Sequence, residues 1–168
     1  MRLIPCLLVA AVYLSGNAAS AQTPWSAALY GGYATGVDNS DYASGSVALI
    51  GDVYRRIGRT TALGVEVGYQ KYESETSARH LAGVLRLRSS GGRWRPYAMT
   101  GLGLYHFRQT GDDLVAPGLS AGGGLELHPN AGPLGIGVGA RFDLAANITE
   151  DGPLGAAILT LMVGLSYR

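Results

Sequence analysis

Apolar and mixed side chains alternate along the end of the chain, from Pro153 to Arg168. Because successive side chains of a strand point to opposite faces, this segment offers one continuous apolar face. A helix would scatter Thr160, Gly164 and Ser166 around an otherwise apolar cylinder, without a polar stripe. We therefore expect a strand with one face against lipid. That face consists of Ala157, Leu159, Leu161, Val163, Leu165 and Tyr167.

Seven earlier segments repeat this alternation. The mature chain of 147 residues (168 less a leader of 21, argued below) allows roughly 18 residues for each strand and its connection, which suits membrane strands of 9–11 residues. The pattern predicts an all-β fold, an eight-stranded antiparallel up-and-down transmembrane β-barrel. The expected strands are 25–35, 44–54, 61–72, 79–88, 95–108, 118–128, 134–146 and 153–168.

Aromatic residues gather near the ends of these segments, which predicts two girdles at the membrane interfaces. A general preference of aromatic residues for strands is the alternative explanation. In segment 95–108 the aromatic residues are assigned to the lipid face, which leaves Leu102 and Leu104 on the inward parity. The girdle residues are Trp25, Tyr33, Tyr69, Tyr97, Tyr105, Phe107, Phe142 and Tyr167, and Met99 is assigned outward with Tyr97.

The first residues predict a secretory signal peptide. Met1-Arg2 is followed by an apolar run from Leu3 to Leu14, and Ala19-Ser20-Ala21 provides a cleavage site. The run is shorter than the roughly 20 residues of a membrane-spanning helix. We expect residues 1–21 to be removed and 22–168 to form one barrel domain. Cys6 lies in the leader, so the mature chain has no disulfide and no cysteine-based metal site.

Charge is scarce and is sorted by position. Only 15% of residues are charged, against about 25% in soluble domains, and the net charge of +1 gives no reason to expect a nucleic-acid partner. The odd connections hold eight of the twelve acidic residues: Asp38, Asp41, Glu73, Glu75, Asp112, Asp113, Glu150 and Asp151. The even connections hold Arg55, Arg56, Arg59, Arg93 and Arg95. This asymmetry favours a membrane protein with a periplasmic N-terminus and outward odd connections.

The four acidic residues outside the connections fall on the inward parity, and so do three arginines of the strands: Asp52, Glu66, Glu126 and Asp143, with Arg86, Arg88 and Arg141. Hairpin pairing places Arg141 opposite Gly122 and brings Asp52, Glu66 and Arg86 near one another. An eight-stranded barrel is about wide enough to be filled by side chains. Since an isolated buried charge costs several kcal/mol, these groups predict a packed, ion-paired interior rather than a channel lining.

Catalysis is weighed on His106, Ser120 and Asp143, which lie on three successive strands. Ser120 falls between the other two, whereas the base of a triad must lie between nucleophile and acid. The glycines from Gly135 to Gly139 have a period of two and form no phosphate-binding loop. We therefore expect no catalytic residue, no cofactor and no metal site. One alternative stays open: the acidic residues of the outer connections bridge divalent cations to lipopolysaccharide.

The apolar final strand ending on Tyr167, together with Arg95-Pro96-Tyr97 opening a glycine-rich strand, resembles small bacterial outer-membrane β-barrels of the OmpA/OmpX-like kind. The resemblance implies the outer membrane, contact with its lipid and lipopolysaccharide, insertion by the barrel assembly machinery through the C-terminal strand, and a monomer. Such barrels serve anchoring, adhesion or surface protection. We expect a non-enzymatic, structural or surface-interacting barrel. The alternatives are a narrow pore for small solutes or ions and a lipid A-modifying enzyme.

Overall fold

The computed structural model describes residues 25–37, 45–72, 76–89, 91–109, 112–129, 132–149 and 152–168, so the predicted signal peptide lies outside the described residues. In the described chain no helix is long and apolar enough to cross a membrane. The strands are close to the predicted segments, except that β6 begins at Asp112 rather than at Gly118. They are β1 (Trp25–Gly36), β2 (Ser46–Arg56), β3 (Thr61–Tyr72), β4 (Ser77–Arg88), β5 (Trp94–Gln109), β6 (Asp112–Leu127), β7 (Leu134–Thr149) and β8 (Gly152–Tyr167).

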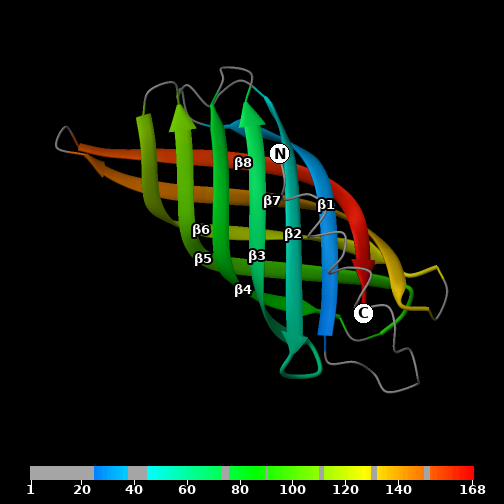
Figure 1. Ribbon diagram of the computed structural model, residues 1–168. Coiled ribbons are helices and arrows are strands. Elements are labelled where there is room, and N and C mark those ends of the chain that lie inside the picture. Colours follow the sequence, from blue (N-terminus) through cyan, green and yellow to red (C-terminus); the bar gives the residue numbers. More distant parts are fainter. Residues whose placement is uncertain are drawn as a thin grey trace.

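The strands form a closed antiparallel barrel in chain order (Figure 1). The closing pair, β1 with β8, is in register from Ala27 opposite Tyr167 to Gly36 opposite Ile158. Figure 1 shows the strands of one wall crossing those of the opposite wall at a steep angle, as the tilt of a closed barrel requires. The predicted fold, an eight-stranded up-and-down barrel, is confirmed.

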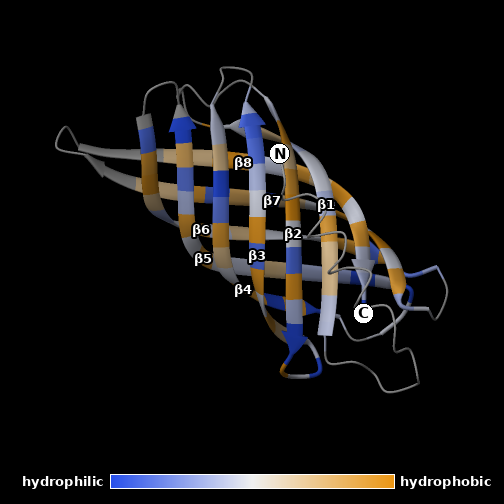
Figure 2. Cartoon of the chain, in the orientation of Figure 1, coloured by the Kyte–Doolittle hydropathy of each residue, from blue (hydrophilic) through white to orange (hydrophobic). Residues whose placement is uncertain are grey.

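The exterior of the barrel is apolar. Leu102, Val163 and Leu165 each expose more than half of their surface, and the matching inward positions of β8, such as Thr160, are buried. Hydrophobic and hydrophilic bands accordingly alternate along the strands (Figure 2). A closed barrel leaves no unpaired strand edge, so its backbone polar groups are satisfied without water. An apolar exterior on such a barrel is the arrangement that spans a bilayer.

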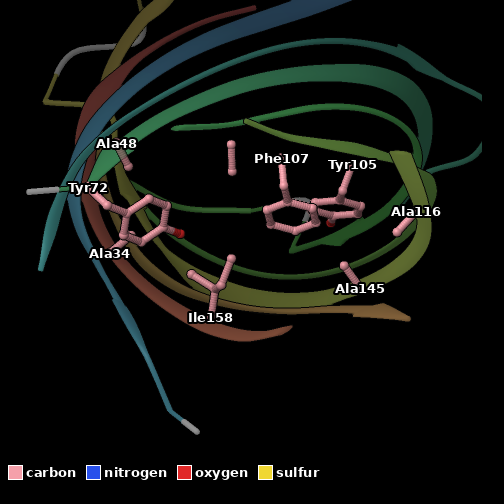
Figure 3. Close-up of a cluster of buried hydrophobic side chains, with 9 residues drawn as sticks. Ala34, Ala48, Tyr72, Tyr105, Phe107, Ala116, Ala145 and Ile158 are labelled. Carbon is pink, nitrogen blue, oxygen red and sulfur yellow. The ribbon is translucent and has the colours of Figure 1, made fainter. Parts of the chain in front are cut away.

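Aromatic side chains fill the interior at the end of the odd connections. Tyr72, Tyr105, Phe107 and Ile158 are buried there among small alanines. Figure 3 shows these side chains projecting inward from the surrounding strands, and the rings of Tyr105 and Phe107 are stacked with centroids 6.3 Å apart. We call this group the aromatic layer.

The predicted orientation of β5 is wrong. Tyr97, Met99, Tyr105 and Phe107 are buried in the interior, whereas Leu102 and Leu104 are 68% and 58% exposed on the outside. Gly101 and Gly103 occupy the inward positions between these groups. A Cβ at Gly101 would lie 2.7 Å from Ser120 Oγ, and one at Gly103 would lie 2.7 Å from Ala82 Cβ. The interior is too crowded there for larger side chains, so the leucines face outward. Tyr97, Tyr105 and Phe107 therefore belong to no interfacial girdle, whereas Trp25, Tyr33 and Tyr69 are exposed on the exterior.

The corrected orientation of β5 can be tested by placing a charge on its outer face. Leu102→Arg is expected to lower the free energy of unfolding by about 2–4 kcal/mol, because Leu102 lies at mid-strand where lipid surrounds it. Leu134→Arg, at the first residue of β7, is the control and is expected to cost about 1 kcal/mol or less. Urea titration of the protein in lipid bilayers measures both. Equal, small losses for the two variants would contradict the assignment.

Candidate functional site

The interior of the barrel, or lumen, is where the structure places the charged residues singled out from the sequence. Six of the seven side chains are buried, and the seventh, Arg88, is 18% exposed at the end of β4. Their strands present them inward because each alternates with apolar residues that face outward. The six buried residues are Asp52, Glu66, Arg86, Glu126, Arg141 and Asp143.

Arg141 on β7 is the centre of one group, which we call the Arg141 cluster. Its Nε donates a hydrogen bond of 2.7 Å to Asp143 Oδ1, and its Nη1 pairs with Glu66 across the barrel. Tyr105 Oη donates to the same Asp143 oxygen at 2.6 Å. His80 Nε2 lies 3.1 Å from Glu66 Oε1, and its ring is stacked on Tyr105 with centroids 5.2 Å apart. Two carboxylates thus share one guanidinium directly beneath the aromatic layer.

Arg86 on β4 is the centre of a second group, the Arg86 cluster. Its Nη2 donates to Glu126 Oε1 at 2.7 Å, and its guanidinium lies 3.9 Å from the ring centroid of Tyr97 and 5.1 Å from that of Tyr54. Arg88 Nη1 lies 3.6 Å from the other oxygen of Glu126. Since Arg88 ends β4, this cluster lies toward the even connections, whereas the Arg141 cluster lies toward the odd ones.

His128, just beyond β6, lies at the end of the barrel that carries the even connections. Its Nε2 lies 3.8 Å from Glu126 Oε2, and the imidazole is almost completely buried. Burial holds the pKa of His128 below its ordinary value, and the nearby Arg95 acts in the same direction. The neutral imidazole is therefore favoured at this position.

The pairing of these charges differs in part from the expectation. Arg141 lies opposite Gly122, as hairpin pairing indicates, and Asp52 lies opposite Glu66. Arg86, however, takes Glu126 as its partner, and Glu66 pairs with Arg141 from the opposite wall. Asp52 forms no salt bridge with another described residue. Local register predicts neighbours along a hairpin, but it does not say which side chains meet across the lumen.

Four residues of the two clusters are not among the site residues predicted from the sequence, although the alternation places His80 and Tyr54 on the inward parity. His80 and Tyr105 belong to the Arg141 cluster, and Tyr54 and Tyr97 flank Arg86. The signal for Tyr97 and Tyr105 was available in the glycines that share their parity on β5. Their aromatic character pointed instead to the membrane interface, because such rings are common in both places.

The candidate catalytic residues are not brought together. Ser120 and Asp143 face each other across β6 and β7, but His106 lies on the exterior parity of β5 and approaches Asp113 at 3.6 Å. Within the described ranges, His, Cys, Asp and Glu residues form no group of three that could hold a metal ion. The contacts that the described side chains of the lumen make are ion pairs and aromatic packing.

These features define the class of fold: a small, closed β-barrel with an apolar exterior and paired charges in its interior, as in outer-membrane proteins. The crystal structure of Neisserial surface protein A is similar, with a TM-score of 0.73 and 12% identity over 86% of this chain and 97% of that one.

Two structures from Pseudomonas aeruginosa are also similar. OprG has a TM-score of 0.58 and 12% identity over 86% of this chain and 96% of that one. The N-terminal barrel domain of OprF has a TM-score of 0.54 and 12% identity over 84% and 97%. In sequence, the chain matches no protein-family profile and no curated protein. At this identity the likeness concerns the fold, and the predicted resemblance to small outer-membrane barrels is confirmed at that level.

The Arg141 cluster predicts a large cost for removing its one cation. Arg141→Met is expected to lower the free energy of unfolding by about 3–5 kcal/mol, because the buried carboxylates of Glu66 and Asp143 then lose the guanidinium that offsets their charge. Adding Glu66→Gln and Asp143→Asn to this variant is expected to restore most of the loss. The measurement is urea titration in lipid bilayers.

Arg88→Met is the control for that experiment. Arg88 is partly exposed, and Arg86 remains on Glu126, so the expected loss is about 1 kcal/mol or less. An equal loss for Arg88→Met and Arg141→Met would show that the ion pairs of the Arg141 cluster have no special weight.

Proposed function

We propose that the protein is a non-enzymatic integral protein of the bacterial outer membrane, with a structural or surface-interacting role and a lumen closed by its own side chains. The observation that carries the proposal is the set of buried aromatic rings and paired charges along the lumen. The aromatic layer lies at one end, the Arg141 cluster lies beneath it, and the Arg86 cluster follows toward the other end.

The arrangement of the lumen supports closure over transport. A channel lining needs polar groups that face water, whereas Arg141 and Asp143 have almost no exposed surface and are bonded to each other. Arg86 is likewise enclosed by Glu126 and two tyrosine rings. Carboxylates of the barrel offset the charge of each guanidinium, so neither arginine provides a free charge that would attract an ion into the lumen.

A narrow pore for small ions is the second candidate, and one observation favours it. The hydroxyl groups of Ser120 and Ser166 are buried in the lumen without a hydrogen-bond partner among the described residues. Polar atoms of this kind are the ones that water bridges inside proteins. A file of water along such groups would give the barrel a small conductance.

Location in the outer membrane implies further parts of the proposal: the surrounding lipid, the route of insertion and the orientation. A barrel with this exterior has lipid as its permanent surrounding, and lipopolysaccharide supplies the lipid of the outer leaflet. Insertion would proceed through the barrel assembly machinery, which reads the C-terminal strand β8, and the working form would be a monomer with the odd connections outside. A lipid A-modifying activity has the weakest support, because His106 is separated from Ser120 and Asp143 by the barrel wall.

Conductance in planar bilayers distinguishes the closed barrel from the pore. The unmodified protein is expected to conduct little, because paired charges and rings occupy the lumen. The double variant Glu66→Ala/Arg141→Ala keeps the net charge and opens space, so its conductance is expected to rise. Leu102→Ala, which removes volume from the outer face alone, is the control and should leave the conductance unchanged. Steady ion-selective conductance from the unmodified protein, unaffected by the double variant, would favour the pore.

Cysteine labelling tests the orientation in the membrane. Val37 follows β1 and is 60% exposed, whereas Gly58 lies in the exposed connection between β2 and β3. Val37→Cys is expected to react with a membrane-impermeant maleimide on whole cells, and Gly58→Cys is expected to react only after the cells are broken. Because Cys6 lies in the predicted leader, no other cysteine competes. Labelling of Gly58→Cys alone on whole cells would invert the orientation.

A further inference from the structure

Three basic side chains lie together on the outer face of β3, β4 and β5, at the end of the barrel where the odd connections are. Lys71 pairs with Ser77 in the β3–β4 register, and Ser77 pairs with Arg108 in the β4–β5 register. Arg79, two residues along β4, shares the exterior parity of Ser77. Lys71, Arg79 and Arg108 are all exposed. We call these three residues and Ser77 the basic patch.

The register fixes the spacing of the patch. Diagonal neighbours on one face of a sheet are about 7–8 Å apart, which applies to Arg79 relative to Lys71 and to Arg108. Lys71 and Arg108 are separated by two strand spacings, or roughly 10 Å. Three long, flexible cations therefore surround the Ser77 hydroxyl. This arrangement suits one phosphate group, which accepts hydrogen bonds from ammonium, guanidinium and hydroxyl donors together.

Protein acids offset the patch only in part. Asp113 Oδ1 lies 3.8 Å from Arg108 Nε and 3.6 Å from the neighbouring His106 Nε2. Lys71 and Arg79 form no salt bridge with a described residue, and Arg79 lies 5.8 Å from the ring centroid of Tyr69. Glu73 and Glu75 lie outside the described residues. Lys71 and Arg79 thus differ from the interior arginines Arg86 and Arg141, which pair with carboxylates of the barrel.

The patch borders the apolar band and is confined to one wall. The next exterior row toward the membrane centre is Val67, Leu81 and Leu104, each exposed. On the opposite wall, formed by β7, β8 and β1, the described exterior positions near the same end carry no basic residue: Leu144, Ala146, Leu159, Tyr33 and Thr35. If these basic residues served only to keep the end of the barrel solvated, they would not have to gather on one wall. A lipid whose chains lie on the apolar band and whose headgroup bears a phosphate would meet both features at once.

We infer that the basic patch binds the phosphate group of an anionic lipid, with Lys71, Arg79 and Arg108 around the phosphate and Ser77 donating to it. The acyl chains lie along Val67, Leu81 and Leu104. If the odd connections face outward, as the proposed function holds, the lipid belongs to the outer leaflet, where lipid A carries phosphate monoesters. The inference rests on the proposed function for this placement, but the binding itself depends only on the patch.

Native mass spectrometry of the full barrel released from detergent micelles tests the binding. The probes are bisphosphorylated lipid A, monophosphorylated lipid A and phosphatidylethanolamine, and the expected affinities fall in that order. The variant Lys71→Gln/Arg79→Gln/Arg108→Gln is expected to bind bisphosphorylated lipid A about tenfold or more weakly, since each cation near a membrane surface contributes to the attraction. The matched control, Arg55→Gln/Arg59→Gln/Arg93→Gln, removes three exposed charges at the other end and should bind as the unmodified protein does.

Heat-modifiable migration on gels reports separately whether each protein is a folded barrel. Should the triple variant fail to fold, the single variants Lys71→Gln and Arg108→Gln are each expected to weaken binding several-fold. Unchanged binding in the patch variants, equal weakening in the control, or equal affinity for phosphatidylethanolamine would overturn the inference while leaving the barrel intact. An unmodified protein that never shows heat-modifiable migration would instead overturn the membrane barrel, and the lipid site with it.

Discussion

Closure of the sheet between β1 and β8 is the constraint on which the rest of the molecule depends. Lipid cannot supply hydrogen bonds to a strand edge, so every backbone group of the wall has to find its partner in a neighbouring strand. Once the wall is closed, each strand has one face toward lipid and one toward the lumen. The exterior has to be apolar, and the polar side chains of the strands have to share a narrow interior.

The narrowness of that interior explains its contents. Side chains of an eight-stranded barrel meet across the lumen, so a large residue on one strand needs a small one opposite. Small residues on neighbouring strands provide room as well: Gly122 lies beside Arg141 in the β6–β7 register, and β5 has Gly101 and Gly103 on its inward face. Charge in so confined a space is tolerable only when it is paired, and Arg141 between Glu66 and Asp143 meets that condition.

The sequence predicts the wall far better than the lumen. Alternation of apolar and polar residues has a period of two, so the order of residues along the chain predicts both the strands and their faces. In β8, for example, it places Leu161 and Val163 outside. The same reasoning failed on β5, because rings such as Tyr105 suit a membrane interface and a packed interior equally well. Partners across the lumen could not be predicted either. Glu66 and Arg141 are 75 residues apart, and their meeting depends on the tilt and stagger of the whole barrel.

The basic residues of the strands fall into two groups, those inside the lumen and those on the outer face, because each strand has one face toward the lumen and one toward lipid. An arginine inside the lumen is stable only with a carboxylate from the same chain, as Arg86 with Glu126. A basic residue on the outer face has no such requirement where the apolar band ends, because water and headgroups can solvate it there. Lys71 and Arg79 therefore cost little to keep without an acidic partner among the described residues, and their charge remains available to whatever surrounds the barrel. The arginines of the lumen are paired with its carboxylates, so of the charged residues on the strands those of the exterior wall are the ones that can contact another molecule.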